Sequence, residues 1–140
     1  MVSVAIIVVV ALGTLNFQYH GAKHSRISEA QVTATNLGQL LLEDWKSTAG
    51  DDAYDPTTLG LGFQTPIYVN PGYYIITLDN QTFYMLLNKQ IAPVANNPDN
   101  VAGVELDQLR VSIRWRPDFT PGALTVDDPV ITLTTYVRKD

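Results

Sequence analysis

The first seventeen residues of the chain carry no charge, and apolar side chains occur on every side of the helix that they would form. As an α-helix this segment rises about 25 Å, close to the roughly 30 Å hydrocarbon core of a membrane. A buried strand through the Val- and Ile-rich centre is the alternative. We expect a helix that is surrounded by lipid or by other copies of the chain. The side chains expected to make these assembly contacts are Val2, Val4, Ile6, Ile7, Val8, Val9, Val10, Leu12, Leu15 and Phe17.

Polar residues then enter the sequence without interrupting the helical spacing. Apolar side chains recur every three or four residues between positions 27 and 45, while charged and amide side chains fall elsewhere around the helix. This pattern predicts an amphipathic helix over residues 18–48, with Gly50 suited to a left-handed cap. Gly38 lies within the stripe and is expected to mark the close approach of a neighbour. The stripe consists of Ile27, Ala30, Ala34, Leu37, Leu41 and Trp45.

A weak point is expected near the end of the apolar segment. Gly13, Thr14 and Asn16 are poor helix formers, and Gly21 follows shortly after them. A glycine costs a helix about 1 kcal/mol relative to alanine. We therefore predict a bend or a locally melted turn at residues 13–16.

The rest of the chain has the pattern of a small antiparallel sheet. Strands are predicted over residues 73–78, 82–87, 109–115 and 130–137, with a hairpin turn at 79–81 and irregular segments at 51–70, 88–103 and 117–129. The fold class expected is α+β, with a long N-terminal helix (1–48) and a β-rich head (49–140). One strand alternates most clearly, and its apolar face should pack on the helix stripe. That face consists of Leu109, Val111, Ile113 and Trp115.

Composition excludes several functional classes. The net charge of −5 and pI near 4.8 argue against nucleic-acid binding, which needs a positive surface. The absence of cysteine excludes disulfides and thiolate metal sites. No nucleophile, base and orienting acid occur together in a recognisable motif. We expect no enzyme activity and no cofactor, with calcium as the one alternative.

The sequence offers two kinds of candidate metal site, and for each the alternative is a set of solvent-exposed polar residues. His20 and His24 lie one helical turn apart, but no third ligand is close in sequence, so exposed helix surface is the preferred interpretation. Oxygen ligands for calcium occur in two acidic clusters, neither of which fits the hand-shaped calcium loop. Solvated loops are therefore preferred there too. The clusters are Asp51, Asp52 and Asp55, and Asp99, Glu105 and Asp107.

Two further features of the predicted head are open to more than one interpretation. Arg110, Arg114 and Arg116 alternate along one strand, where they either meet acidic groups of a neighbouring subunit or are simply solvated. Asn80 begins an Asn-Gln-Thr acceptor pattern for glycosylation at the expected hairpin tip, a pattern that is common by chance.

A helix that is first wholly apolar and then amphipathic, followed by an antiparallel sheet, resembles the type IV pilins and the type II secretion pseudopilins. The residues that carry this resemblance are 1–13, 25–45, 109–115 and 131–137. The family's cleavage site after glycine, its methylated phenylalanine and its nearby glutamate do not occur in this sequence. We therefore expect Met1 to be an internal residue of a longer chain.

The resemblance implies a structural subunit of an extracellular filament. Such a subunit waits in the inner membrane, and a pilus or secretion assembly machinery then transfers its apolar helix into a bundle of identical helices. The basic residues Lys23, His24 and Arg26 oppose this orientation by the positive-inside tendency, yet an acidic, β-rich head suits the exterior. A pseudopilin or minor pilin is one alternative, and a monomeric membrane-anchored binding domain is another.

Overall fold

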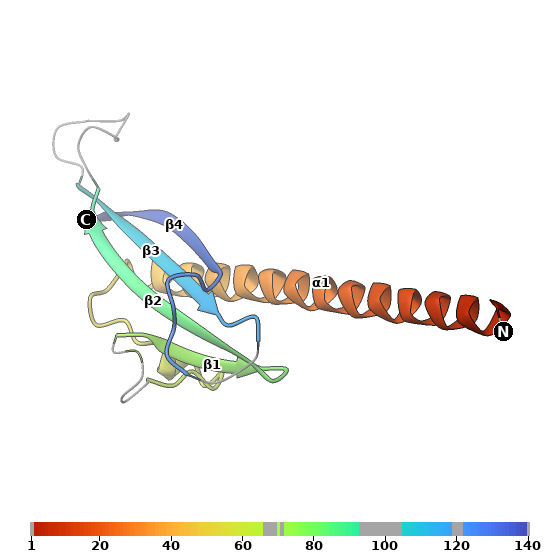
Figure 1. Ribbon diagram of the computed structural model, residues 1–140. Helices are drawn as coiled ribbons and strands as arrows, with labels where there is room; N and C mark the ends of the chain where they lie inside the picture. Colours follow the sequence, from red (N-terminus) through yellow and green to blue (C-terminus); the bar gives the residue numbers. More distant parts are fainter. Residues whose placement is uncertain (1, 66–69, 71, 93–104, 119–121, 140) are drawn as a thin grey trace. The chain divides into compact units, whose positions relative to one another are not determined.

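The computed structural model describes residues 2–65, 70, 72–92, 105–118 and 122–139, with residues 2–17 and 139 described by their backbone alone. The chain divides into two compact units, Met1–Val32 and Thr33–Asp140. Figure 1 shows the elements in sequence colours.

One helix, α1, extends over Val2–Ser47. Its backbone is helical through residues 13–16, so the melted turn expected there is absent from this chain. The physical reason is that helix propagation is cooperative. A few residues that each cost up to about 1 kcal/mol do not interrupt a helix that continues on both sides of them.

The helix ends as the sequence predicts. Gly50 has φ +71°, and its N–H donates to the carbonyl of Trp45 at 3.0 Å. This is the left-handed cap expected at Gly50. The following segment contains one short 3₁₀ helix, η1 (Pro56–Leu59), in which the Asp55 side chain accepts a hydrogen bond from the N–H of Thr57.

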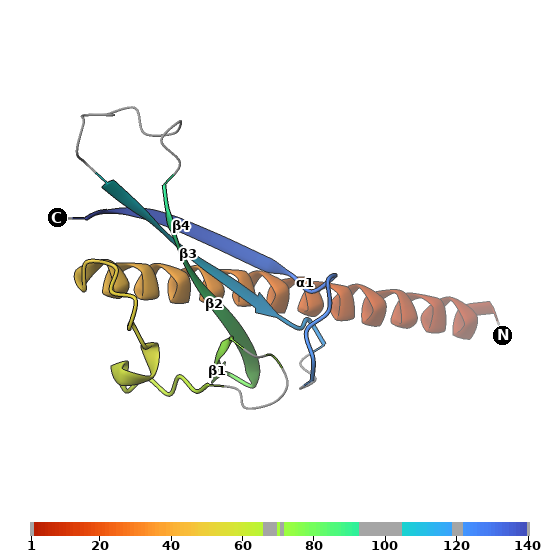
Figure 2. The same cartoon turned by 90° about the vertical axis from the view of Figure 1, so that its left-hand side faces the viewer.

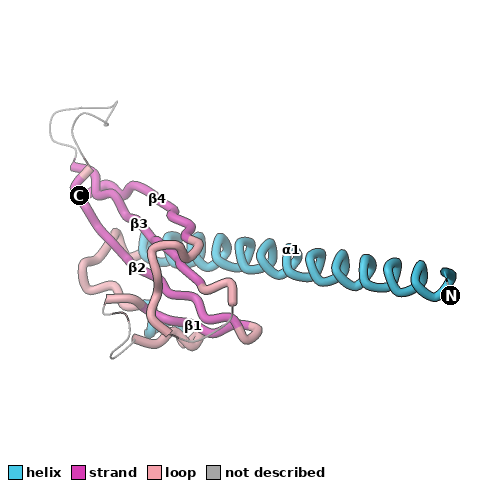
Figure 3. Tube along the Cα trace, viewed as in Figure 1, coloured by secondary structure: helices cyan, strands magenta, loops and turns pink. Residues whose placement is uncertain are grey.

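The second unit contains a four-stranded antiparallel sheet in the order β1-β2-β3-β4 (Figure 2). The fold is therefore α+β, as predicted. Each expected strand is present, and the helix, strands and loops are distinguished in Figure 3. The bounds are β1 Tyr74–Leu78, β2 Gln81–Ile91, β3 Glu105–Trp115 and β4 Val130–Lys139.

Two boundaries differ from the prediction. The hairpin between β1 and β2 turns on two residues, Asp79 and Asn80, both at positive φ, with Leu78 paired to Gln81. The next hairpin is longer than expected, because β2 continues to Ile91 and β3 begins at Glu105. The polar residues at this end suggest a loop, yet they continue the ladder and its alternation to the pair of Ile91 with Asp107.

The core of the second unit lies between α1 and the sheet. From the helix it takes Ala34, Leu37, Leu41 and Trp45, and from β3 it takes the four predicted apolar residues, all of which are buried. Gly38 confirms the expected close approach, since a Cβ at this position would lie 2.5 Å from Leu133 Cδ1 and 3.2 Å from Ile113 Cδ1. The helix thus packs directly on β3 and β4.

Candidate functional site

The candidate assembly surface is the first part of α1. Every residue from Gln18 to Glu29 is exposed except Ile27, which is half-buried, and Ala30 is the first buried residue in the part of α1 whose side chains are described. The side chains of residues 2–17, which contain the predicted assembly contacts, lie outside the described part of the chain. Among the described residues, we find no helix with both the length and the apolar character needed to cross a bilayer.

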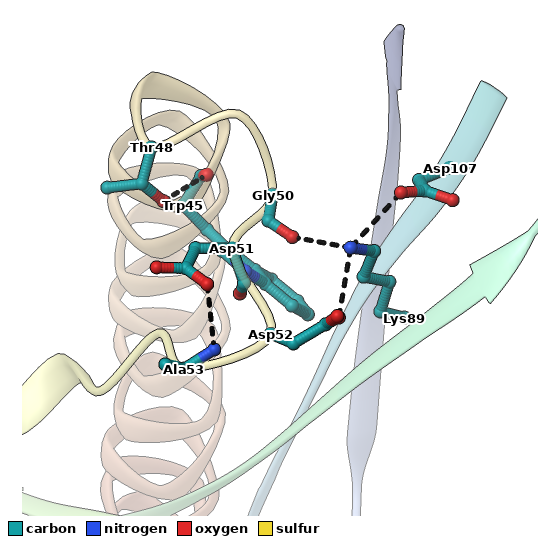
Figure 4. A network of polar contacts seen from close by, with 8 residues as sticks. All are labelled: Trp45, Thr48, Gly50, Asp51, Asp52, Ala53, Lys89 and Asp107. Carbon is teal, nitrogen blue, oxygen red and sulfur yellow. Dashed lines mark hydrogen bonds and ion pairs between the residues drawn. The ribbon is translucent and has the colours of Figure 1, made fainter. Parts of the chain in front are cut away.

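The end of α1 is fixed to the sheet by a network around Lys89 (Figure 4). The ammonium nitrogen of Lys89 donates to Asp52 Oδ1 at 2.9 Å, to Asp107 Oδ2 at 3.1 Å and to the Gly50 carbonyl at 2.8 Å. Asp107 is only 4% exposed. The hydrogen bond to Asp52, and then the one to Asp107, raise the pKa of Lys89 above its ordinary value. Lys89 therefore joins the loop after α1 to β2 and β3.

Trp45 continues this attachment on the helix side. Its indole N–H donates to the Asp51 carbonyl at 2.9 Å, and its ring stacks on Tyr54 with centroids 5.6 Å apart. The Tyr54 hydroxyl is buried without a hydrogen-bond partner of standard geometry within the described part of the head. Burial, and then the nearby Asp44 carboxylate, raise the pKa of Tyr54 well above its usual range.

Each carboxylate of the first calcium candidate has its own interaction. Asp51 accepts from the N–H of Ala53, Asp52 pairs with Lys89, and Asp55 caps η1. In the second candidate, Asp107 also pairs with Lys89, while Asp99 lies outside the described residues. No group of three His, Asp or Glu side chains suited to a metal occurs within the described ranges.

The remaining candidates are the two histidines, the three arginines and the glycosylation pattern, and the structure describes all of them. His20 and His24 are exposed on α1. Arg110 and Arg114 are half-buried on the polar side of β3, where Arg114 donates to the Thr125 carbonyl at 3.2 Å. Arg116 follows the strand and pairs with Asp118 at 3.1 Å. Asn80 is exposed at the tip of the β1–β2 hairpin, as expected.

Sequence reasoning missed Lys89, although a signal for it exists. Lys89 continues the alternation of Phe83, Met85 and Leu87, and it pairs with Leu109 across the ladder. Once β2 is extended by two residues beyond Leu87, an inward-facing lysine is predicted. An inward-facing acidic partner, Asp107, follows from the same alternation on β3.

Comparison with known proteins gives no assignment. No protein-family model, no curated protein and no solved structure matches this chain.

Proposed function

We propose that this chain is a structural subunit of a type IV pilus-like extracellular filament, and that it polymerises through residues 1–17. The observation that carries the proposal is that the two parts of one helix differ in where their apolar residues can be buried. Its C-terminal part completes the core of the second unit, while seventeen uncharged residues at its start have no such role in the sequence pattern. Apolar surface of this extent requires burial elsewhere.

In this proposal the apolar segment is used twice. It lies in the inner membrane before assembly and in a bundle of identical helices afterwards, at the cell surface. Because apolar contacts replace apolar contacts, the transfer loses little burial energy. The contacts between subunits are heterologous and do not close, so they generate a helical fibre.

In this proposal, residues 13–16 change conformation when the subunit enters the fibre. They are helical in the isolated chain, and we propose that assembly unwinds them so that the stem lengthens as it packs. A density map of the fibre with unbroken helical geometry from Val10 to Phe17 would refute this role.

Electron microscopy of material sheared from cells tests the main proposal. Fibres that contain this chain, identified by mass spectrometry, are the expected result. Recovery of the chain exclusively in membranes, as a monomer, contradicts the proposal and indicates a membrane-anchored binding domain.

A further inference from the structure

The two edges of the sheet differ in how far their backbone groups are paired. At the β1 edge, Gln64 and Ile75 exchange both of their backbone hydrogen bonds, at 2.8 and 2.7 Å. At the other edge, β4 pairs with β3 alone among the residues that the structure describes. Figures 1 and 2 both show β4 as the outer margin of the sheet. One edge is thus partly closed, and the other presents a full strand.

The backbone groups at the open edge follow from the ladder. The N–H of Trp115 donates to the Pro129 carbonyl, and these two residues continue the β3–β4 register one step beyond the pair of Arg114 with Val130. Bonding alternates along an antiparallel pair, so Ile131, Leu133 and their odd-numbered successors bond to β3. The amides and carbonyls that point to the free edge are those of Val130, Thr132, Thr134, Tyr136 and Arg138.

Most of this edge lacks the usual protection against pairing. Natural edge strands carry charges, prolines or bulges, but residues 130–137 contain neither a charge nor a proline, and the charges of β4 are confined to its last two residues, Arg138 and Lys139. Val130 is 47% exposed and Tyr136 is 48% exposed. Ile131 and Leu133 remain half-buried although they lie on the core side. A further strand would cover these side chains and satisfy the free backbone groups.

We propose that β4 pairs with β4 of a second copy of this chain, in antiparallel orientation. The charges that flank the strand select this arrangement. Asp127 and Asp128 precede it, and Arg138 lies at its other end. Antiparallel pairing sets the acidic flank of each copy against the basic flank of the other. Parallel pairing sets like charges together, which is unfavourable.

The same geometry fixes the register. Only even-numbered residues present free amides, so even positions face even positions. Setting Asp128 opposite Arg138 of the second copy sets Thr132 opposite Thr134 and Val130 opposite Tyr136. The core-side residues then remain on one side of a continuous sheet, with Leu133 opposite Leu133. Because this two-fold contact reverses the strand direction, it cannot repeat along a fibre whose subunits all point one way, and it does not depend on the proposed filament.

Disulfide cross-linking of the full chain in detergent tests the register, and the chain supplies no cysteine of its own. T132C and T134C are purified separately and oxidised alone or mixed. Opposite residues have Cα atoms about 5.5 Å apart, within disulfide range, whereas identical residues of the two copies would lie about 7–8 Å apart, outside it. We expect the mixture to form a disulfide dimer roughly tenfold faster than either variant alone. This rate ratio corresponds to a difference of about 1.4 kcal/mol in the activation free energy.

A matched cysteine controls for random collision. Thr77 is also exposed, and its hydroxyl bonds to Thr82 at 3.1 Å, as that of Thr132 bonds to Ser112 at 3.1 Å. T77C mixed with T134C should cross-link no faster than either variant alone. Equal cross-linking by T132C alone and by the mixture would indicate a parallel or nonspecific contact, and it would overturn the proposal. Absence of the mixed dimer would overturn it as well.

A proline variant separates edge pairing from other association, such as contact through the apolar helix. V130C and Y136C, also opposite in this register, are cross-linked with T134P present in both copies. Proline removes a free-edge amide and leaves the β3 ladder intact, so the cross-link should be lost while circular dichroism stays unchanged. T77P, which removes an outward amide from β1, should preserve it. A T134P pair that cross-links as fast as the parent pair contradicts the proposal.

Discussion

The two ends of α1 differ in how their apolar residues are distributed around the helix. From Thr33 to Ser47, one stripe of the helix packs on a sheet of the same chain, and the opposite side is polar and exposed. Residues 1–17 have no polar side at all. A helix with one apolar stripe is satisfied within its own domain, whereas a helix that is apolar all round needs partners from outside. This difference supports the proposal that one continuous helix serves two different surroundings.

The largest expected effect comes from a charge in the apolar segment. V8D places a carboxylate near the centre of that segment, where a bilayer-buried aspartate costs roughly 2.5–3.5 kcal/mol. We expect membrane retention and fibre recovery to be lost, while the melting temperature of the head is unchanged. The matched control is V32D, at an exposed position of the same helix (58% exposed). Fractionation of cell membranes measures the difference, and equal retention of the two variants would argue against a special role for residues 1–17.

A substitution in the helix stripe that packs on the sheet should instead lower the stability of the head. Leu41 is fully buried, and L41A should lower the free energy of unfolding by about 3 kcal/mol through lost burial and a cavity. Its neighbour Leu40 is 39% exposed, so L40A should cost less than about 1 kcal/mol. Urea unfolding of the two variants provides the measurement. Similar losses for both would mean that the helix packs on the sheet by another side.

The Lys89 network is expected to contribute somewhat less. K89M leaves the buried Asp107 carboxylate without its cation and should cost about 2–3 kcal/mol. Because the folded-state pKa of Lys89 is raised, its contribution is fully present below the unfolded value near 10.4 and is lost as the pH rises through the folded pKa. The stability difference between wild type and K89M should therefore be constant from pH 7 to about 9.5 and shrink above about 10.5. A difference that grows at high pH would contradict this assignment.

Two glycines of α1 should respond in opposite directions. G38A forces Leu133 and Ile113 to move, and we expect a net loss of about 1 kcal/mol despite the better helix propensity of alanine. Gly21 has no atom within 4 Å of an added Cβ, so G21A should raise helix stability by up to about 1 kcal/mol. Amide hydrogen exchange along α1 reports both effects. A gain in both variants would show that the contact at Gly38 is not tight.

The smallest effect is expected at Tyr54. Within the described part of the head, its buried hydroxyl has no hydrogen-bond partner of standard geometry, so Y54F should leave the free energy of unfolding within about 0.5 kcal/mol of wild type or raise it slightly. Thermal unfolding followed by circular dichroism is sufficient. A loss above about 1 kcal/mol would reveal a hydrogen bond from this hydroxyl.

The features that sequence predicted best are those with strict periodicity. The alternation from Leu109 to Trp115 gave a strand, and the three- and four-residue spacing up to Trp45 gave a helix, because each pattern fits one secondary structure only. The ends of β2 and β3 were missed, since most of the residues that extend them are polar and two of these, Lys89 and Asp107, form an ion pair between the strands. Helical geometry at residues 13–16 was also missed, because local propensity was weighed without the cooperativity of the flanking helix.

The candidate assembly segment stays a prediction from sequence alone, which rests on its length and uniform apolarity and on no tertiary contact. The open β4 edge could not be predicted from sequence. Strand order decides which strand lies at the margin of the sheet, and that order depends on contacts between residues distant in sequence. Sequence could place Ile131 and Leu133 in a strand but could not show that the sheet ends there.

A density map of isolated fibres at side-chain resolution is the strongest test of polymerisation through the apolar helix. We expect residues 2–17 of many copies to pack together along the fibre axis, with the sheets outside them. A fibre whose axis is formed by the heads, or one in which residues 2–17 face solvent, would contradict it.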